Sequence, residues 1–307
     1  MGFIKAAQLF LKELESSGSK ACFISVEQLK QAETLYNDLI EKKLIAPNMY
    51  KRYLDNYYDF KAVYENKSVK SICITATPSP ISIVRFEYNN LSIDVEIPPI
   101  YTDRRDILEK IKKASEVFLK FGYSTYPVCL PKKPLSVHGG LAEYGRNNLV
   151  YVEGMGSFHR LTAFATDALI DSYQWRGLKR METCDSCKAC LNNCPTGAIR
   201  YENPIIDADR CLTFHNEQSA QFPEWIEATW HHALVGCLRC QDACPNNRAQ
   251  KNNRKFIGTF DSTETELIIT QKPFSDLPEI LQEKLKKFSM DIYYHTLSKN
   301  LQVLRRK

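Results

Sequence analysis

Apolar residues recur at helical spacing through the first 65 residues of the chain. Within residues 27–45, Leu29, Leu35, Leu39 and Ile40 fall on one face of a single helix. We therefore expect residues 1–65 to be helical throughout.

Residues 69–97 change to a strand-like pattern. Two strands are predicted on either side of a turn at Asn89 and Asn90, and such a hairpin implies antiparallel pairing. Residues 103–121 return to helical spacing, with Asp103 as the expected N-cap. The positions expected to face inward in this helix are Ile107, Ile111, Ala114, Val117 and Phe118.

The second half of the chain is more varied. Residues 123–148 are rich in Pro, Gly and Asn and predict an irregular stretch. Two strands are expected within 149–153 and 159–170, and an amphipathic helical segment ends the chain. Its apolar positions are Leu281, Leu285, Phe288 and Ile292. Strands between helices, with a hairpin, predict a mixed α+β fold.

Composition places the chain among globular proteins. It has 307 residues, of which 44% are hydrophobic and 25% charged, enough to bury a normal core. No run approaches the ~18 consecutive apolar residues of a membrane helix. The N-terminal segment lacks the pattern of a secretory signal, and Ala6 stands where a myristoylation motif needs Ser or Thr. We therefore expect a cytoplasmic protein with no membrane partner.

Eleven cysteines are many for such a chain, and clustered cysteines in the cytoplasm indicate metal ligands before disulfides. One run has the spacing C-x2-C-x2-C-x3-C-P, which is that of bacterial ferredoxins. Its members are Cys184, Cys187, Cys190 and Cys194, followed by Pro195. In that pattern the first three thiolates bind one [4Fe–4S] cluster and the fourth binds the other cluster.

A second group ends in the same way, with Cys237, Cys240 and Cys244 followed by Pro245, and Cys211 stands alone before it. The crossover rule of two-cluster ferredoxins then assigns two sets of ligands. Cluster one takes Cys184, Cys187, Cys190 and Cys244, and cluster two takes Cys194, Cys211, Cys237 and Cys240. Two adjacent clusters indicate an electron path.

Structural zinc sites are the alternative reading, because paired C-x2-C motifs also bind zinc. A triple run followed by C-P, with a second C-P ending, favours the clusters over zinc. Of the other cysteines, Cys22 and Cys73 lie in apolar contexts and are expected in the core, whereas Cys129 lies in the irregular stretch and could face a pocket.

The clusters also change the meaning of the charge. The formal charge is +5 with every cysteine counted as a neutral thiol. A cubane core on four thiolates carries about −2, so two clusters lower the total to about +1. The basic excess therefore gives little support to a nucleic-acid partner, which stays open.

The region before the cysteines resembles a known superfamily. Residues 138–150 read HGGLAEYGRNNLV, residues 154–160 read GMGSFHR, and residues 164–167 read FATD. This block, followed by the cysteine order above, is similar to epoxyqueuosine reductases and reductive dehalogenases. The resemblance covers roughly residues 70–250 and, more weakly, the tail.

The resemblance implies a nitroreductase-like α+β domain followed by a ferredoxin-like double-cluster module and a helical tail. We place these at residues 1–178, 179–250 and 251–307, with the tail packed on the first domain. It also implies base-off cobalamin as a cofactor that receives electrons from the clusters. Residues matching the family's cofactor region, or able to approach a flat ligand closely, are His138, Gly139, Gly140, Gly145, Arg146 and Asn148. For Arg146 an ordinary surface salt bridge is the alternative.

A reductive reaction also needs a proton donor. Epoxyqueuosine reductases carry an Asp where this chain has Ser124, and an unperturbed Ser is no general acid near neutral pH. Dehalogenases use a Tyr, so Tyr126 and Tyr123 become the candidate catalytic residues, with simple packing as the alternative for Tyr126.

The leading hypothesis is a cytoplasmic iron–sulfur reductase that passes electrons through two [4Fe–4S] clusters to cobalamin and reduces a small substrate that the sequence does not identify. Its electron donor would be a protein such as a ferredoxin or flavodoxin. The alternative is a cobalamin-free electron relay of the same fold. A third reading, a tRNA-acting enzyme, rests on the basic tail residues Lys284, Lys286, Lys287, Arg305, Arg306 and Lys307.

Overall fold

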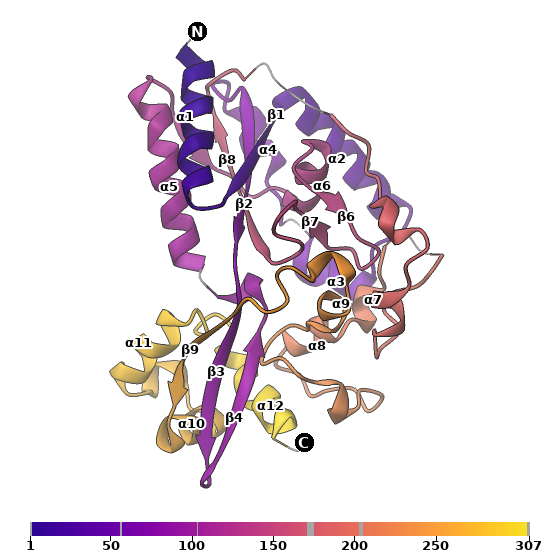
Figure 1. Ribbon diagram of the computed structural model, residues 1–307, viewed down its shortest axis with the longest axis vertical. Helices are drawn as coiled ribbons and strands as arrows, with labels where there is room; N and C mark the ends of the chain where they lie inside the picture. The colour runs from indigo at the N-terminus through magenta and orange to yellow at the C-terminus, as the bar shows by residue number, and fades with distance from the viewer. Residues whose placement is uncertain (1, 56, 103, 171–174, 203–204, 306–307) are drawn as a thin grey trace. The chain divides into compact units, whose positions relative to one another are not determined.

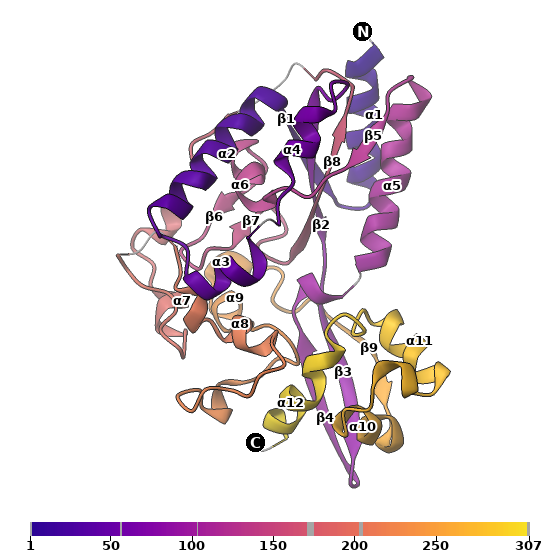
Figure 2. The ribbon, with the colours of Figure 1, turned by 180° about the vertical axis from the view of Figure 1, so that it is seen from behind.

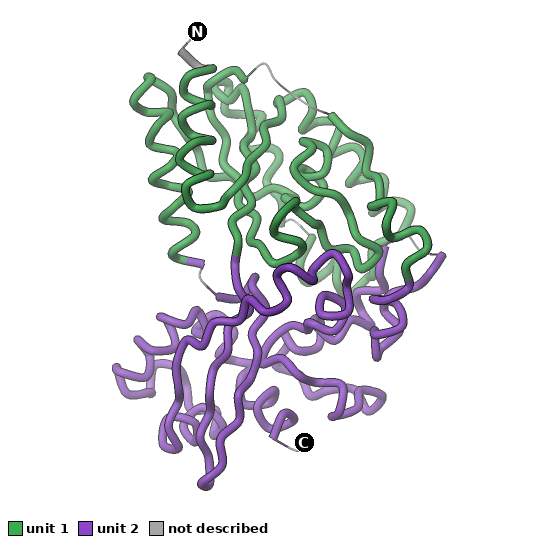
Figure 3. The backbone as a smooth tube through the Cα atoms, in the orientation of Figure 1, with its two compact units in different colours: residues 1–78, 105–187 green, residues 79–104, 188–307 purple. Residues whose placement is uncertain are grey.

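The computed structural model describes residues 2–55, 57–102, 104–170, 175–202 and 205–305 (Figure 1). The chain forms two compact units, each made of two separate stretches (Figure 3). Unit 1 comprises Met1–Pro78 and Arg105–Cys187, and unit 2 comprises Ser79–Arg104 and Lys188–Lys307.

A four-stranded antiparallel sheet in the order β1-β2-β8-β5 forms the centre of unit 1. Its strands are β1 (Lys20–Ser25), β2 (Ser71–Pro78), β5 (Thr125–Pro127) and β8 (His159–Thr166). Its helices are α1 (Gly2–Ser16), α2 (Val26–Glu41), α3 (Pro47–Tyr53), α4 (Phe60–Glu65), α5 (Arg104–Lys120) and α6 (Lys132–His138). The short strands β6 (Glu143–Tyr144) and β7 (Val150–Tyr151) pair as a separate hairpin.

Helices cover both faces of this sheet, as Figures 1 and 2 show. Successive residues of a strand point to opposite faces: Cys73 of β2 joins a cluster with α1 and α5, whereas Ile72 and Ile74 join a cluster with α2, α4 and α6. Unit 1 is therefore a three-layer α/β/α arrangement, which confirms the mixed α+β prediction for this part of the chain.

The prediction of helix throughout residues 1–65 is wrong at β1. Cys22, Phe23 and Ile24 are consecutive buried residues, and a short apolar run of this kind cannot be told from a helix by periodicity alone. Pairing with β2 decides its conformation. Within α2, Leu29 is buried as expected, but Leu35 is 42% exposed.

The other predicted elements of this region are confirmed. The strands β3 (Ile81–Tyr88) and β4 (Leu91–Ile97) form the expected hairpin. Asn89 and Asn90 have φ angles of 48° and 60°, the left-handed pair that a tight two-residue hairpin turn requires. All five positions predicted to face inward in α5 are buried. Asp103, the expected cap, lies outside the described residues.

Unit 2 contains a second sheet, in the order β4-β3-β9. Strand β9 (Arg254–Phe260) runs parallel to β3. Its helices of four or more residues are α7 (Ala189–Asn192), α8 (Leu212–Asn216), α9 (Arg239–Asp242), α10 (Ser262–Ile269), α11 (Glu279–Lys287) and α12 (Tyr294–Leu304). One apolar cluster joins the hairpin to the tail and includes Phe86, Phe260, Leu281, Leu285 and Leu301.

The compact units follow different boundaries from the domains expected from sequence. The tail packs on β3 and β4, which lie within the predicted first domain, because β9 adds a strand to that hairpin. The hairpin, the module and the tail thus form unit 2 together. Of the tail residues predicted to be buried, Leu281, Leu285 and Phe288 are, whereas Ile292 is 43% exposed. Among the described helices, none is long and apolar enough to cross a membrane.

Candidate functional site

The two cysteine groups have the same local structure. Each places a cysteine in a four-residue helix, Cys190 in α7 and Cys240 in α9, and a second cysteine four residues later, before proline. The backbone N–H of Cys194 donates to Leu191 O at 3.3 Å, and that of Cys244 donates to Gln241 O at 3.2 Å. The two helices pack against each other, as expected of two halves of a ferredoxin-like module.

Three of the four ligands predicted for cluster two gather in unit 2. Burial raises the pKa of the Cys237 thiol to about 12, with further contributions from the neighbouring Cys211 and Cys194. Burial likewise raises the pKa of Cys211, with Cys194 again a neighbour. Three thiols from distant parts of the chain therefore lie close together, as ligands of one cluster must.

No group of three or more His, Cys, Asp or Glu side chains in the described part of the chain is arranged around a single metal ion. The ligands of a [4Fe–4S] cluster do not converge on one ion, because each of the four thiolates binds a different iron atom. The division between the units falls within the first cysteine run, so Cys184 and Cys187 belong to unit 1 and the other six cysteines of the module to unit 2.

Arg146 holds the start of that run within unit 1. Its side chain is buried, and its guanidinium donates to the carbonyl oxygens of Cys184, of Asp185 at 3.4 Å and of Cys187 at 3.2 Å. The rigid fork of an arginine is suited to several acceptors at once. The structure therefore places the buried Arg146 side chain against the backbone of two predicted cluster ligands.

The β6–β7 hairpin carries Arg146 at its turn. Asn148 supplies the turn with a left-handed residue at φ 59°, and its carbonyl accepts from Lys133 Nζ at 3.3 Å. A Cβ on Gly145 would lie 2.5 Å from the Tyr151 ring, so this position needs glycine for packing. Gly145 and Asn148 thus shape the turn that presents Arg146.

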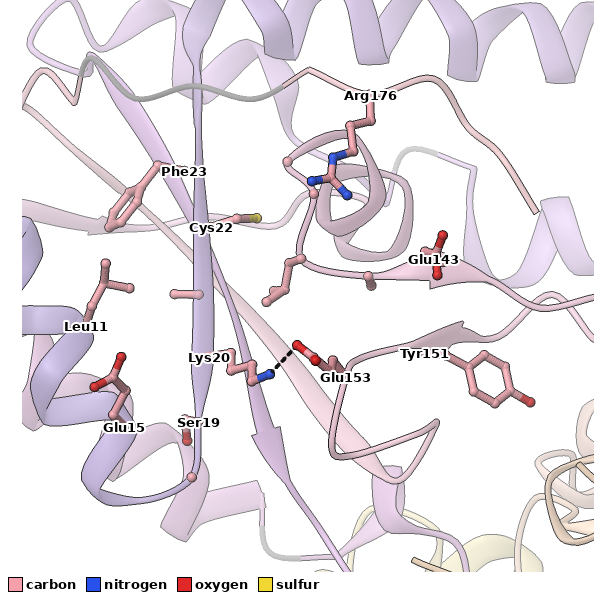
Figure 4. Close-up of a pocket in the computed structure, with 16 residues that line it drawn as sticks. Leu11, Glu15, Ser19, Lys20, Cys22, Phe23, Glu143, Tyr151, Glu153 and Arg176 are labelled. Carbon is pink, nitrogen blue, oxygen red and sulfur yellow. Dashed lines mark hydrogen bonds and ion pairs between the residues drawn. The ribbon is translucent and has the colours of Figure 1, made fainter. Parts of the chain in front are cut away.

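A cavity of about 830 Å³ opens in unit 1 between β1 and the segment that leads into this hairpin (Figure 4). Its volume lies in the range of sites for sizeable organic ligands. The residues that line it are Leu11, Glu15, Gly18, Ser19, Lys20, Ala21, Cys22, Phe23, Gly139, Gly140, Leu141, Ala142, Glu143, Tyr151, Glu153 and Arg176. Of the residues predicted to bind a cofactor, Gly139 and Gly140 therefore line the cavity.

The wall formed by β1 is an edge of the sheet, since β2 pairs with it on one side only. An edge strand presents backbone N–H and C=O groups that have no partner in the sheet. Charged groups add to this lining: Lys20 Nζ lies 3.2 Å from a Glu153 carboxylate oxygen, and Arg176 projects from the opposite side (Figure 4). The cavity thus offers both donors and acceptors to a polar, amide-bearing ligand.

His138 acts on the cavity through Arg176. Its Nδ1–H donates to Arg176 O at 2.6 Å, the Arg176 N–H donates back to His138 O at 2.8 Å, and its ring stacks on Trp175 with 4.0 Å between centroids. Burial lowers the pKa of His138. Nε2 is buried with no hydrogen-bond partner among the described residues, so the neutral ring serves to fix the Trp175-Arg176 segment.

Gly139 packs directly on Cys22. A Cβ added there would meet Cys22 Sγ at 2.5 Å and Leu135 O at 3.2 Å. We expect Gly139→Ala to lower the free energy of unfolding by about 1–3 kcal/mol, the usual effect of overpacking. Adding Cys22→Ala to this variant should recover part of the loss. Chemical denaturation of Gly139→Ala, Cys22→Ala and the double variant measures both effects. Equal stability of Gly139→Ala and the parent would contradict this packing.

The segment around Ser124 packs against the sheet. Ser124 N–H donates to an Asp167 carboxylate oxygen at 2.8 Å, and its carbonyl accepts from Thr166 Oγ1 at 2.8 Å. Tyr126 lies in β5 and is half-buried against the apolar cluster below α2 and α6, and Tyr123 packs against the cluster below α1 and α5. The catalytic role of either tyrosine stays a prediction. Cys22 and Cys73 are buried as expected, and Cys129 is half-buried.

Several residues of the cavity escaped the sequence analysis. Lys20, Glu153 and Arg176 come from three distant segments, one of which was assigned to a helix, and no motif links them. Their only common signal is charge in short segments between apolar runs, which is too frequent on any surface to be informative.

Residues 183–247 match the family described as 4Fe-4S double cluster binding domain, and this range includes all eight predicted ligands. The match confirms the iron–sulfur reading over the zinc reading.

Epoxyqueuosine reductases of known sequence are similar to this chain beyond the cysteine module. An epoxyqueuosine reductase of Aliivibrio fischeri is 32% identical over 51% of this chain, but the match spans only 44% of its own length. An epoxyqueuosine reductase of Cellulophaga algicola is 23% identical over 98% of this chain and 97% of its own length.

Solved structures show the same fold. A crystal structure of an epoxyqueuosine reductase with an epoxyqueuosine-modified tRNA-Tyr stem loop matches with a TM-score of 0.65, at 18% identity, over 98% of this chain and 81% of that one. Reductive dehalogenase structures match with a TM-score of only 0.40. The resemblance inferred from the motif block is thus confirmed: this chain is similar to epoxyqueuosine reductases over nearly its whole length and contains their kind of double [4Fe–4S] domain.

Proposed function

We propose that this protein is an iron–sulfur reductase that acts on an epoxide-bearing nucleoside in a tRNA stem loop, with cobalamin as its resident cofactor. The similarity to epoxyqueuosine reductases supports the substrate class. It supports a tRNA substrate in place of the unidentified small substrate expected from the sequence, in line with the third reading. A tRNA substrate also agrees with the expected cytoplasmic location.

The observation that carries the proposal is the double role of the β6–β7 hairpin in unit 1. Glu143 and Tyr151, one from each strand, line the cavity, while Arg146 at the turn donates to the carbonyls of Cys184 and Cys187. The N–H of Met181 also donates to Tyr144 O at 2.8 Å. One short element thus connects the cavity wall to the loop of the first two cluster ligands, as a reductase needs between an electron carrier and a reaction site.

The cavity suits cobalamin on chemical grounds. The corrin ring is broad and fringed with amides, which can pair with the backbone of the β1 edge and with the charged groups Lys20, Glu143 and Arg176. Gly139 and Gly140 place bare backbone at the cavity wall. When bound, cobalamin supplies a strongly reducing metal centre; the protein's own part is to orient it and exclude water.

A proton source completes the proposal. Removing an epoxide oxygen as water takes two electrons and two protons, so a donor must stand near the substrate. Tyr126 and Tyr123 stay the candidates for this role, since Ser124 cannot fill it. Neither lines the cavity, and β5 lies at the edge of the sheet opposite to β1. In the assay described next, Tyr126→Phe should lower turnover and leave the iron content unchanged; full activity would remove Tyr126 from the mechanism.

The direct test incubates anaerobically reconstituted protein with cob(II)alamin, a low-potential reductant and an epoxyqueuosine-modified stem loop. Nucleosides released from the RNA are then analysed by mass spectrometry. We expect a product that has lost one oxygen atom, with no change in a stem loop carrying the unmodified base. An unchanged substrate, in the presence of both clusters and bound cobalamin, would exclude this substrate.

The second candidate function is an electron relay without cobalamin. The observation that favours it is Ser124 at the position where the similar family has an acid. A relay would reduce a partner protein at the same rate with or without added cobalamin, whereas the reductase would be inactive without it.

A further inference from the structure

Helix α12 of unit 2 is unusually polar on its buried side. Thr296, Ser298, Lys299 and Asn300 are all buried, and Lys299 is only 6% exposed. Burial lowers the pKa of Lys299 to about 8. Placing an ammonium group out of water is unfavourable unless its hydrogen bonds are made, so these side chains must have specific partners.

Lys299 finds three such partners in the module's long insertion. Its Nζ donates to His215 O at 2.9 Å, Gln218 O at 2.6 Å and Ala220 O at 2.9 Å. It also lies over the Phe222 ring, 3.9 Å from the centroid. An ammonium group has three protons, and all three are used here. The acceptors are carbonyls at and beyond the end of α8, and His215 O also accepts from the Gln218 N–H at 3.3 Å.

Asn300 links two other parts of the same insertion, the end of α8 and the segment 234–236. Its Nδ2 donates to Asn216 O and to Leu234 O, each at 2.8 Å. Asn216 in turn donates from its own Nδ2 to Gly236 O at 2.7 Å. These bonds tie the end of α8 to the segment 234–236.

The two tied segments adjoin two predicted ligands of cluster two. Helix α8 begins directly after Cys211, and residue 236 directly precedes Cys237. These cysteines are 26 positions apart in the sequence. Their flanks are joined by the Asn216–Gly236 bond within the insertion and by Asn300 of α12. From α12, Asn300 bonds to both flanks, whereas Lys299 bonds to the segment that follows Cys211.

We propose that Lys299 and Asn300 are positioning residues for cluster two, and that the C-terminal helix holds Cys211 and Cys237 at the separation the cluster needs. The inference rests on the iron–sulfur part of the proposed function and not on its substrate. A chain with a disturbed α12 should therefore fail first in its iron content, before any substrate is added.

The test compares Lys299→Met with Ser298→Ala after anaerobic reconstitution. Methionine keeps the length of the side chain but removes all three hydrogen bonds that Nζ donates to His215, Gln218 and Ala220. Ser298 is a matched control, because it is equally buried on the same helix but donates to Ile269 O at 2.6 Å, outside the insertion. Iron per chain, iron release to a chelator, the EPR spectrum of the reduced protein and thermal unfolding are measured for each.

We expect Lys299→Met to release half of its iron about tenfold faster than the parent, because the hydrogen bonds that fix the segment after Cys211 are lost. Its EPR spectrum should then match that of Cys211→Ser. Ser298→Ala should keep all its iron even if its unfolding temperature falls as far. Equal iron release from both variants, or full retention in Lys299→Met, would overturn the proposal. Stem-loop reduction is read separately, so a failed substrate leaves this result intact.

Discussion

Replacing Cys211 with serine will remove one cluster and leave the other, so that the iron content falls from about eight to about four atoms per chain. Cys211 stands alone between the two cysteine groups, yet its half-buried thiol neighbours those of Cys194 and Cys237. Serine lacks the soft thiolate that iron–sulfur clusters require.

The measurement is iron and sulfide analysis with EPR of the reduced protein. Cys129→Ser is the matched control: Cys129 is also a half-buried cysteine, outside the matched domain, and its replacement should leave both clusters in place. If Cys211→Ser retained the iron and sulfide of the parent, the assignment of ligands to cluster two would be wrong.

The second large effect concerns Arg146. Arg146→Gln removes a positive charge and the donors to the carbonyls of Cys184, Asp185 and Cys187. A positive charge beside a cluster stabilises its reduced, more negative form. We therefore expect the reduction potential of the cluster on this loop to fall, by about 60 mV for every 1.4 kcal/mol of interaction lost.

An EPR-monitored redox titration measures both clusters separately and checks this result. Arg146→Lys keeps the charge but not the planar fork, so its potential should lie between those of the parent and Arg146→Gln. Unchanged potentials in both variants would show that Arg146 serves the fold alone.

The cluster ligands could be predicted from the sequence because most of them lie close together in it, at the spacing that a [4Fe–4S] cluster requires. Three cysteines separated by two residues each, followed by a fourth before proline, constrain one loop around one cluster. The same holds for α5, whose five inward positions follow a single helical period.

Neither the cavity nor the contacts of Lys299 and Asn300 with the insertion could be predicted. Each depends on segments that only the fold brings together. One wall of the cavity is β1, a six-residue strand assigned to a helix because its apolar run is too short to show a period. Arg146 was expected to bind the cofactor. The carbonyl groups to which it donates lie 38 to 41 positions later in the sequence, and no sequence motif links them to it. Lys299 looks like any helix lysine until its burial is known.

The central claim is that the unit 1 cavity binds cobalamin. Its most direct test is an anaerobic titration of the reconstituted protein with cob(II)alamin, followed by EPR, alongside the variant Lys20→Trp, which places a large ring at the cavity wall. The proposal predicts a base-off Co(II) signal that saturates at one per chain in the parent and is lost in the variant. A spectrum identical to that of free cob(II)alamin would contradict it and leave the electron relay as the function.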